Sequence, residues 1–94
     1  MQRLYLTSYR FRGDLDDDDL QDLTKKFAEV GQSPDVMAHY VTLDGRGGFL
    51  VQSAEGDPEE GYRTTLQYGP WIEFESTPVT TIEEAFPVIQ SVYG

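Results

Sequence analysis

The stretch "YVTLDGRGGFLVQS", Tyr40 to Ser53, places a glycine cluster, Asp44 to Gly48, between two segments of high β propensity. Asp-Gly between two apolar runs indicates a hairpin, because glycine supplies the positive φ that tight hairpin turns require. A phosphate-binding loop is the alternative, but it needs a strand, then the glycines, then a helix. Here a strand follows the glycines directly. The stretch therefore predicts a hairpin between a strand over about 36–43 and one over 49–54.

Two elements are predicted before this hairpin. The segment "RLYLTSY", Arg3 to Tyr9, alternates leucines with tyrosines and threonine, which is typical of a strand with two unequal faces. The segment "RGDLDDDDLQDLTKK", Arg12 to Lys26, then leads into apolar residues at helical spacing.

The aspartates between Asp14 and Asp19 raise the question of a cation site. An EF-hand loop needs oxygen ligands at positions 1, 3 and 5, a glycine at 6 and a glutamate at 12. With Asp14 at position 1, Asp19 falls at position 6 and Lys25 at position 12, so the motif fails. Aspartates at a helix start instead accept free backbone N–H groups and complement the helix dipole. We expect a helix that ends at Gly31, with weak adventitious cation binding by the aspartates as the alternative.

Three elements are predicted after the hairpin. The segment "DPEEGYRTTLQY", Asp57 to Tyr68, has the N-cap, proline and acidic first turn of a helix start. The segment "GPWIEFESTPV" predicts a strand that ends at a sheet edge, because Pro78 cannot donate to a central ladder. The segment "TTIEEAFPVIQSVYG" predicts a helix that begins at Thr80 or Thr81 and is limited in regularity by its proline.

The element order is β-α-β-β-α-β with a C-terminal helix, the order of the ferredoxin-like fold. We expect one α+β domain over residues 1–94, whose antiparallel sheet has helices on one face only. Strand alternation predicts that the following residues face the helices: Leu4, Leu6, Phe49, Val51, Ile72 and Phe74. The opposite face is then expected to carry Tyr5, Thr7, Tyr9, Leu50, Gln52, Trp71, Glu73 and Glu75.

The aromatic side chains of this second set form too large an apolar surface to stay in water. Pairing with a second copy is the simplest cover, because homodimers dominate soluble oligomers. We therefore expect two chains to close their sheets into a dimeric α+β barrel. We expect Trp71 to depend on that assembly for its burial.

The segments "DGRGGFLVQSAEGDPEE" and "WIEFESTPV" resemble a small uncharacterised bacterial family of the dimeric α+β barrel superfamily. In that family an Asp-Gly hairpin, a glycine before the third strand and a final "F-E-V-x-P-V"-like strand recur. The resemblance covers nearly the whole chain and implies a ferredoxin-like protomer and a dimer, although the aspartate-rich first helix departs from the usual pattern. It implies no reaction, because related barrels include monooxygenases, haem-degrading and chlorite-handling enzymes, isomerases and ligand sensors.

Composition limits the partners. The 17 acidic and 7 basic residues give a formal charge of −10, which repels nucleic-acid phosphates and anionic lipid surfaces. The absence of cysteine excludes disulfides and thiolate metal sites. No apolar run is long enough to span a membrane, and the N-terminus lacks a signal-peptide core. We expect a cytoplasmic protein with no nucleic-acid or membrane partner, and no metal or cofactor.

Three side chains are candidates for catalysis. His39 is the only histidine, and its ordinary pKa lies near neutrality. A two-residue turn would place His39 opposite Gln52 on the barrel face, whereas a three-residue turn would place it toward the helices. Glu73 and Glu75 share one strand face and could act as acid and base in a cavity. Charges on an edge strand also protect against aggregation, which is the alternative for both.

Three functions follow from these features. The first is a homodimeric small-molecule-binding barrel whose aromatic face, with Tyr5, Tyr9, Gln52 and Trp71, holds an apolar or aromatic ligand. The second is a cofactor-free enzyme, monooxygenase-like or isomerase-like, that uses His39 or a carboxylate. The third is a structural or interaction module in which subunit packing consumes the aromatic face and no ligand binds.

Overall fold

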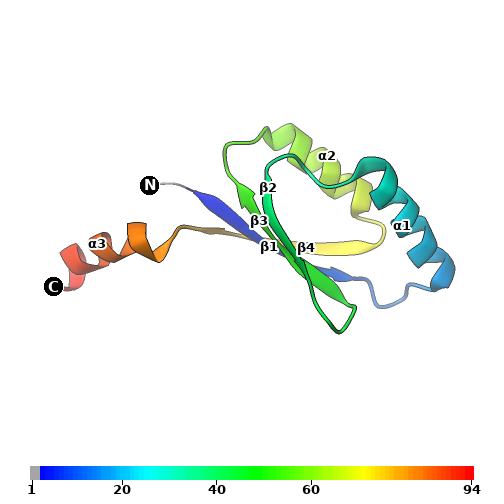
Figure 1. Cartoon of the computed structure of the whole chain (residues 1–94), viewed down its shortest axis with the longest axis horizontal. Helices are drawn as coiled ribbons and strands as arrows, with labels where there is room; N and C mark the ends of the chain where they lie inside the picture. Colours follow the sequence, from blue (N-terminus) through cyan, green and yellow to red (C-terminus); the bar gives the residue numbers. More distant parts are fainter. Residues whose placement is uncertain (1–2) are drawn as a thin grey trace.

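Four antiparallel strands and three helices make up the computed structural model, which describes residues 3–94. The strands are β1 (Leu4–Phe11), β2 (Val36–Val41), β3 (Gly47–Ser53) and β4 (Ile72–Val79), in the sheet order β2-β3-β1-β4. The helices are α1 (Asp17–Val30), α2 (Pro58–Tyr68) and α3 (Ile82–Tyr93). Helices α1 and α2 lie on one side of the sheet, whereas α3 extends away from it (Figure 1). The predicted α+β element order is confirmed, and it is compatible with the ferredoxin-like fold.

The predicted hairpin between β2 and β3 is confirmed, but its loop consists of the four residues Leu43–Arg46. The amide of Thr42 donates to the carbonyl oxygen of Gly47 at 2.9 Å and closes the ladder. Gly45 supplies the positive φ, at 75°. The Asp44 carboxylate accepts a hydrogen bond from the Thr42 hydroxyl at 2.6 Å, and this bond is the main cause that lowers the pKa of Asp44 below its ordinary value.

The aspartate run starts α1, as predicted. The Asp16 carboxylate accepts a hydrogen bond from the Asp19 amide at 2.8 Å, and the Asp19 carboxylate accepts one from the Asp16 amide at 3.1 Å. Gly31 ends the helix with a φ of 72°. Across residues 3–94, His, Asp and Glu side chains do not gather in groups of three that could hold a metal ion.

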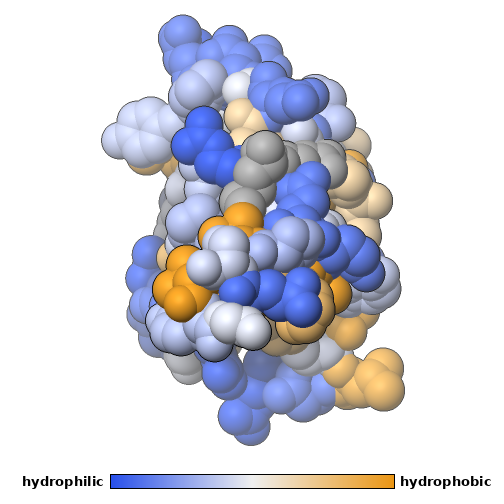
Figure 2. Space-filling view, turned by 90° about the vertical axis from the view of Figure 1, so that its left-hand side faces the viewer, coloured by the Kyte–Doolittle hydropathy of each residue, from blue (hydrophilic) through white to orange (hydrophobic). Residues whose placement is uncertain are grey.

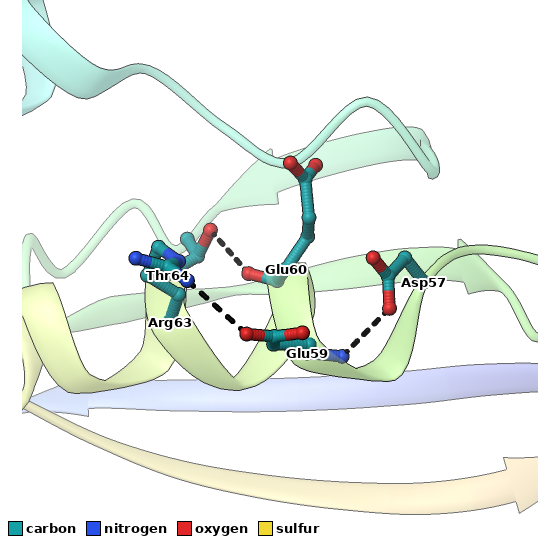
Figure 3. Close-up of polar contacts among 5 residues, drawn as sticks. All are labelled: Asp57, Glu59, Glu60, Arg63 and Thr64. Atoms are coloured by element: carbon teal, nitrogen blue, oxygen red, sulfur yellow. Dashed lines mark hydrogen bonds and ion pairs between the residues drawn. The ribbon is translucent and has the colours of Figure 1, made fainter.

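The other two helix starts follow the same chemistry. In α2 the Asp57 carboxylate accepts a hydrogen bond from the Glu59 amide at 3.0 Å, and Arg63 pairs with Glu59 one turn later at 3.3 Å (Figure 3). At the start of α3 the Thr81 hydroxyl accepts one from the Glu84 amide at 3.3 Å. Each cap satisfies a backbone donor that the helix itself leaves unpaired. None of the helices in the described part of the chain has the length and apolar content of a membrane span.

The face assignment was wrong for β1 and β3. Thr7 and Tyr9 are buried beneath the helices. Their register partners Leu50 and Gly48 lie on the same face. The residues on the helix side are Tyr5, Thr7, Tyr9, Phe11, His39, Leu50, Gln52, Ile72, Phe74 and Ser76. The residues on the other side, called here the open face, include Leu4, Leu6, Phe49, Val51, Glu73 and Glu75.

The reversal has a physical reason. Both residue sets of β1 are apolar enough to be buried, so alternation alone could not choose between them. The hydroxyl groups of Thr7 and Tyr9 find hydrogen-bond partners under the helices, and such partners remove most of the cost of burying a polar atom. The assignment for β4 is confirmed, with Ile72 and Phe74 toward the helices.

The core lies between the sheet and its two covering helices. Its buried members are Tyr9, Leu23, Tyr68 and Ile72. Trp71 packs against this cluster and is partly buried. Its amide donates to the Tyr68 carbonyl oxygen at 3.0 Å, and its carbonyl accepts from the Arg12 amide at 2.9 Å. The expectation that the protomer alone leaves Trp71 uncovered is therefore wrong.

Gly48 is where strand β3 passes closest to Tyr9. A Cβ added at Gly48 would collide with the carbonyl oxygen of Tyr40 and the hydroxyl of Tyr9. We expect Gly48→Ala to lower the free energy of unfolding by about 1–3 kcal/mol, the usual cost of overpacking. Urea denaturation followed by circular dichroism measures the change.

Gly61→Ala is the matched control, because the same change in α2 meets no atom within 4 Å. Alanine is favoured over glycine inside a helix by about 1 kcal/mol, so this variant should be more stable than the parent. A Gly48→Ala protein as stable as the parent would contradict the close packing of Tyr9 on β3.

Candidate functional site

A cavity of about 170 Å³ lies between the sheet and helices α1 and α2. Strands β1, β3 and β4 contribute Thr7, Leu50 and Phe74 to its wall, and α1 contributes Phe27. The far side is formed by α2, through Tyr68 and two threonines. Most of the lining is apolar, which is the usual character of small-molecule sites.

No charged side chain of residues 3–94 lines this cavity, although 26% of the chain is charged. A charged ligand that entered would lose its hydration and find no opposite charge, which costs several kcal/mol. The lining therefore favours a neutral occupant.

One network of side-chain hydrogen bonds runs along the cavity wall and joins Tyr9, His39 and Gln32. The Tyr9 hydroxyl lies 2.7 Å from Nε2 of His39, and Nδ1 of His39 lies 3.0 Å from Oε1 of Gln32. Because an amide oxygen only accepts, Nδ1 carries the hydrogen, and when the ring holds this single hydrogen the Tyr9 hydroxyl donates to Nε2. Burial raises the pKa of Tyr9 above its ordinary value of 10.0, so the phenol stays a donor at neutral pH.

A second network of hydrogen bonds joins the side chains of Thr7, Gln52 and Ser76 on the floor of the cavity. The Thr7 hydroxyl donates to Oε1 of Gln52 at 2.7 Å and lies 2.8 Å from Oγ of Ser76. A hydroxyl has one hydrogen, so Ser76 donates to Thr7. Within the described residues this is the one side-chain hydrogen bond of Gln52, and its amide N–H groups are donors for a ligand.

The threonines of α2 offer little to a ligand. The Thr64 hydroxyl donates to the Glu60 carbonyl oxygen at 3.1 Å (Figure 3). The Thr65 hydroxyl donates to the Gly61 carbonyl oxygen at 3.0 Å. Both hydroxyl groups are thus satisfied by their own helix. The polar contacts of the cavity come from the sheet and from the end of α1.

Tyr68 ties the two covering helices together. Its hydroxyl donates to the carbonyl oxygen of Gly31, the C-cap of α1, at 2.6 Å. Its ring lies 6.5 Å from that of Phe27, centre to centre. This contact fixes the end of α2 against the end of α1 and so holds the cavity open between the helices and the sheet.

Three of the predicted site residues meet at this cavity: Tyr9, His39 and Gln52. His39 pairs with Leu50 rather than with Gln52, because the hairpin loop is longer than a two-residue turn. The shift of two residues keeps His39 on the same sheet face as Gln52. That face lies toward the helices, so His39 lines a cavity of its own protomer rather than a barrel interior.

The other predicted site residues lie elsewhere. Tyr5 is on the helix side but borders a separate hollow, and Trp71 packs beside the core. Glu73 and Glu75 lie on the open face, where Glu73 pairs with Arg12 at 3.1 Å. The two carboxylates therefore do not share a site with His39.

Sequence reasoning missed Gln32 and Ser76. The alternation of β4 places Ser76 on the face of Phe74, and this signal was available. Gln32 lies in the loop after α1, where periodicity gives no orientation.

The two buried tyrosines, Tyr9 and Tyr68, should make the free energy of unfolding fall at alkaline pH. Burial raises the pKa of Tyr9 and Tyr68 above the ordinary 10.0. As the pH rises through that value, the unfolded chain loses these protons first, so the free energy of unfolding falls. Below that value the tyrosines contribute their full stabilisation.

Tyr68→Phe should reduce this alkaline loss and cost about 1 kcal/mol at neutral pH through the missing hydrogen bond. Urea unfolding at about pH 8 and about pH 10.5 measures both effects. Tyr62→Phe, at an exposed position of α2, is the control. An alkaline loss in Tyr68→Phe as large as that of the parent would contradict the buried Tyr68 hydroxyl.

Sequence comparison gives a family and no activity. No curated protein matches the sequence. The model of the family described as "Domain of unknown function (DUF3303)" matches residues 3–93, a span that includes every helix and strand of the structure. The expected membership of a small uncharacterised family is thereby confirmed. The chain belongs to the DUF3303 family of domains of unknown function.

Proposed function

We propose that this protein is a homodimeric α+β barrel domain that binds a small neutral molecule in the cavity between the sheet and helices α1 and α2. The absence of charge from the cavity lining, in a chain with a formal charge of −10, carries the proposal. Such segregation keeps the cavity free of the fixed carboxylates that cover the rest of the chain.

The size of the cavity limits the ligand. An apolar cavity of about 150 Å³ holds benzene, and this cavity measures about 170 Å³. Phe27 and Phe74 supply aromatic walls. Gln52 supplies N–H donors on the floor. A one-ring compound with a neutral hydrogen-bond acceptor fits these features.

The cavity also has an energetic consequence. Empty space inside a core lacks packing contacts and lowers stability. A ligand that fills the space adds those contacts and stabilises the folded state by an amount that grows with the logarithm of its concentration over Kd. Ligand binding should therefore raise the free energy of unfolding of this domain, whose buried core consists of few side chains.

The homodimer is supported by apolar side chains that one protomer leaves in water. On the open face Leu6 is 40% exposed and Phe49 is 44% exposed. In this proposal these side chains form the dimer contact that was expected of Tyr5, Tyr9 and Trp71. A second copy of the chain that covers the open face removes them from water, and it makes that face an interface rather than the ligand site.

The affinities of phenol and benzoate distinguish a site that binds neutral molecules from one that binds any aromatic molecule. Phenol should bind with a Kd in the micromolar to millimolar range, as its size permits, and benzoate at neutral pH should bind at least about tenfold more weakly because its charge loses hydration. Titration by NMR, with Phe27 and Phe74 as reporters, measures both. Equal affinity for the two compounds would contradict the proposal.

Gln52→Leu and Thr64→Val form a matched pair on opposite walls of the cavity. Gln52→Leu should weaken phenol about tenfold, the effect of one lost hydrogen bond. Thr64→Val should leave the affinity within about twofold, because the Thr64 hydroxyl is already satisfied inside α2. If both variants bind phenol like the parent, Gln52 does not contact the ligand.

The Tyr9–His39 hydrogen bond favours a second candidate, a cofactor-free enzyme of the monooxygenase or isomerase kind. A ligand can give a proton to the Tyr9 oxygen while the Tyr9 hydroxyl proton moves to Nε2 of a neutral His39, and the reverse transfer returns it. Glu73 and Glu75 lie on the other face of the sheet, so His39 is the proton-transfer group of this candidate.

His39→Ala distinguishes the two functions. An enzyme that uses His39 as its base should lose turnover by about 10²-fold or more, whereas a binding domain should keep its phenol affinity within a few-fold. Turnover that survives the substitution would contradict the catalytic role. A chain that binds neither phenol nor other neutral one-ring compounds would favour the structural module instead.

A further inference from the structure

Helix α3 has the pattern of a helix that packs against another surface. One stripe consists of Ile82, Ala85, Phe86, Ile89, Val92 and Tyr93, which recur at helical spacings. The opposite side carries Glu83, Glu84, Gln90 and Ser91. A two-sided pattern of this kind normally marks a helix whose apolar stripe is buried.

The apolar stripe of α3 has no such cover in the protomer. None of the residues from Ile82 to Tyr93 is buried. Ile82 is 63% exposed and Val92 is 66% exposed. Figure 2 looks at the end of the molecule that carries α3 and shows hydrophobic groups at the surface beside hydrophilic ones.

The backbone directs α3 away from its own sheet. The helix begins directly after its N-cap Thr81, which has an extended conformation with φ −77° and ψ 155°. It therefore continues the direction of β4 instead of turning back (Figure 1). The protein is elongated as a result, 56 Å in its longest dimension and 16 Å in its shortest.

A matching apolar surface exists on the same chain. The open face carries Leu4 and Leu6 on β1 and Phe49 and Val51 on β3, and Leu6 pairs with Val51 across the two strands. Leu4 pairs with Val79, the last residue of β4, so this face extends to the end of the sheet from which the chain continues into α3.

We propose that α3 is an exchanged arm: in the homodimer of the proposed function, on which this inference rests, α3 of each chain packs its apolar stripe on the open face of the other. Two-fold symmetry then makes two equivalent contacts, and together they bury both helix stripes and both open faces.

The area is sufficient for a stable dimer. A large apolar side chain has an area of about 150–200 Å², and roughly half of it is exposed in α3. The apolar stripe of one helix therefore exposes roughly 500 Å². Two helices and the two surfaces that they cover would bury about 2,000 Å², which reaches the upper part of the range of stable interfaces, about 1,200–2,000 Å².

The charges on the helix favour a second copy over a lipid surface. Membrane-surface helices are rich in lysine and arginine on their polar side, whereas α3 contains Glu83 and Glu84 and no basic residue. The net charge of −10 per chain opposes association at low salt. Because the contact itself is apolar, added salt should screen that repulsion and tighten the dimer.

Ile89→Asp and Ser91→Asp test the arm, since they add the same charge to opposite sides of α3. Sedimentation equilibrium should show a dimer for the parent and for Ser91→Asp, and a monomer for Ile89→Asp, with a Kd raised at least about 100-fold by the buried charge. Phenol titration of each variant reports whether the protomer and its cavity are intact.

Isotope-filtered NMR on a mixed dimer locates the docking surface. The chain has three isoleucines, Ile72, Ile82 and Ile89, and two of them lie on α3. With isoleucine methyl groups labelled in one chain and the partner unlabelled, Ile82 and Ile89 should give cross-peaks to leucine or phenylalanine protons of the other chain. Ile72, in the core of its own protomer, should give none.

The outcomes separate the arm from the rest of the account. A parent protein that is monomeric at about 100 µM, well above the Kd expected of a standard interface, would overturn both the dimer and the arm, while phenol binding can persist. A dimer that survives Ile89→Asp, or a dimer without cross-peaks from Ile82 and Ile89, would overturn the arm alone.

Discussion

The hydroxyl of Tyr9 lies 2.7 Å from Nε2 of His39, and this hydrogen bond joins the central strand β1 to the edge strand β2 across β3. It can form because Gly48, the β3 partner of Tyr9, has no side chain where the Tyr9 ring lies. The same ring is a buried member of the core beneath α1 and α2. Part of the core and one wall of the cavity therefore depend on a single tyrosine and on the glycine opposite it.

The cavity follows from how the covering helices are held. Tyr68 anchors α2 to the C-cap of α1, and the pair stands over a sheet face whose floor is polar at Thr7, Gln52 and Ser76. The hydroxyl groups of this floor are hydrogen-bonded, but the amide N–H groups of Gln52 would lose water without gaining a partner if apolar side chains covered them. A neutral cavity with donors on its floor and aromatic groups in its walls is the result, in a chain whose carboxylates are kept at the surface.

The sequence was sufficient for the elements and their order, because glycine and the helix caps act locally. The Asp-Gly hairpin, the aspartate start of α1 and the Asp57 start of α2 were all predicted from such local signals. The faces of β1 and β3 were not, because Leu4 and Leu6 compete with Tyr5 and Tyr9 for burial. Hydrogen-bond partners that are far away in sequence decided which face of β1 is buried.

The same limit applies to the candidate site. Tyr9 and Gln52 were predicted to share a face and do so, and His39, whose face depended on the turn length, lies on it as well. The prediction placed that face in a barrel between two chains. Hydrogen bonds over long sequence separations, such as that between Thr7 and Ser76, are invisible to alternation. Glu73 and Glu75 were grouped with His39 only because the strand faces had been reversed.

The central claim is that the ligand lies inside each protomer while the open face serves the dimer. A crystal structure with 4-bromophenol tests it most directly, because the anomalous signal of bromine locates the compound without reference to the model of the protein. The account predicts one bromine in each protomer, between Phe27 and Phe74 and near Gln52. Bromine between the open faces of two chains, with these cavities empty, would contradict it.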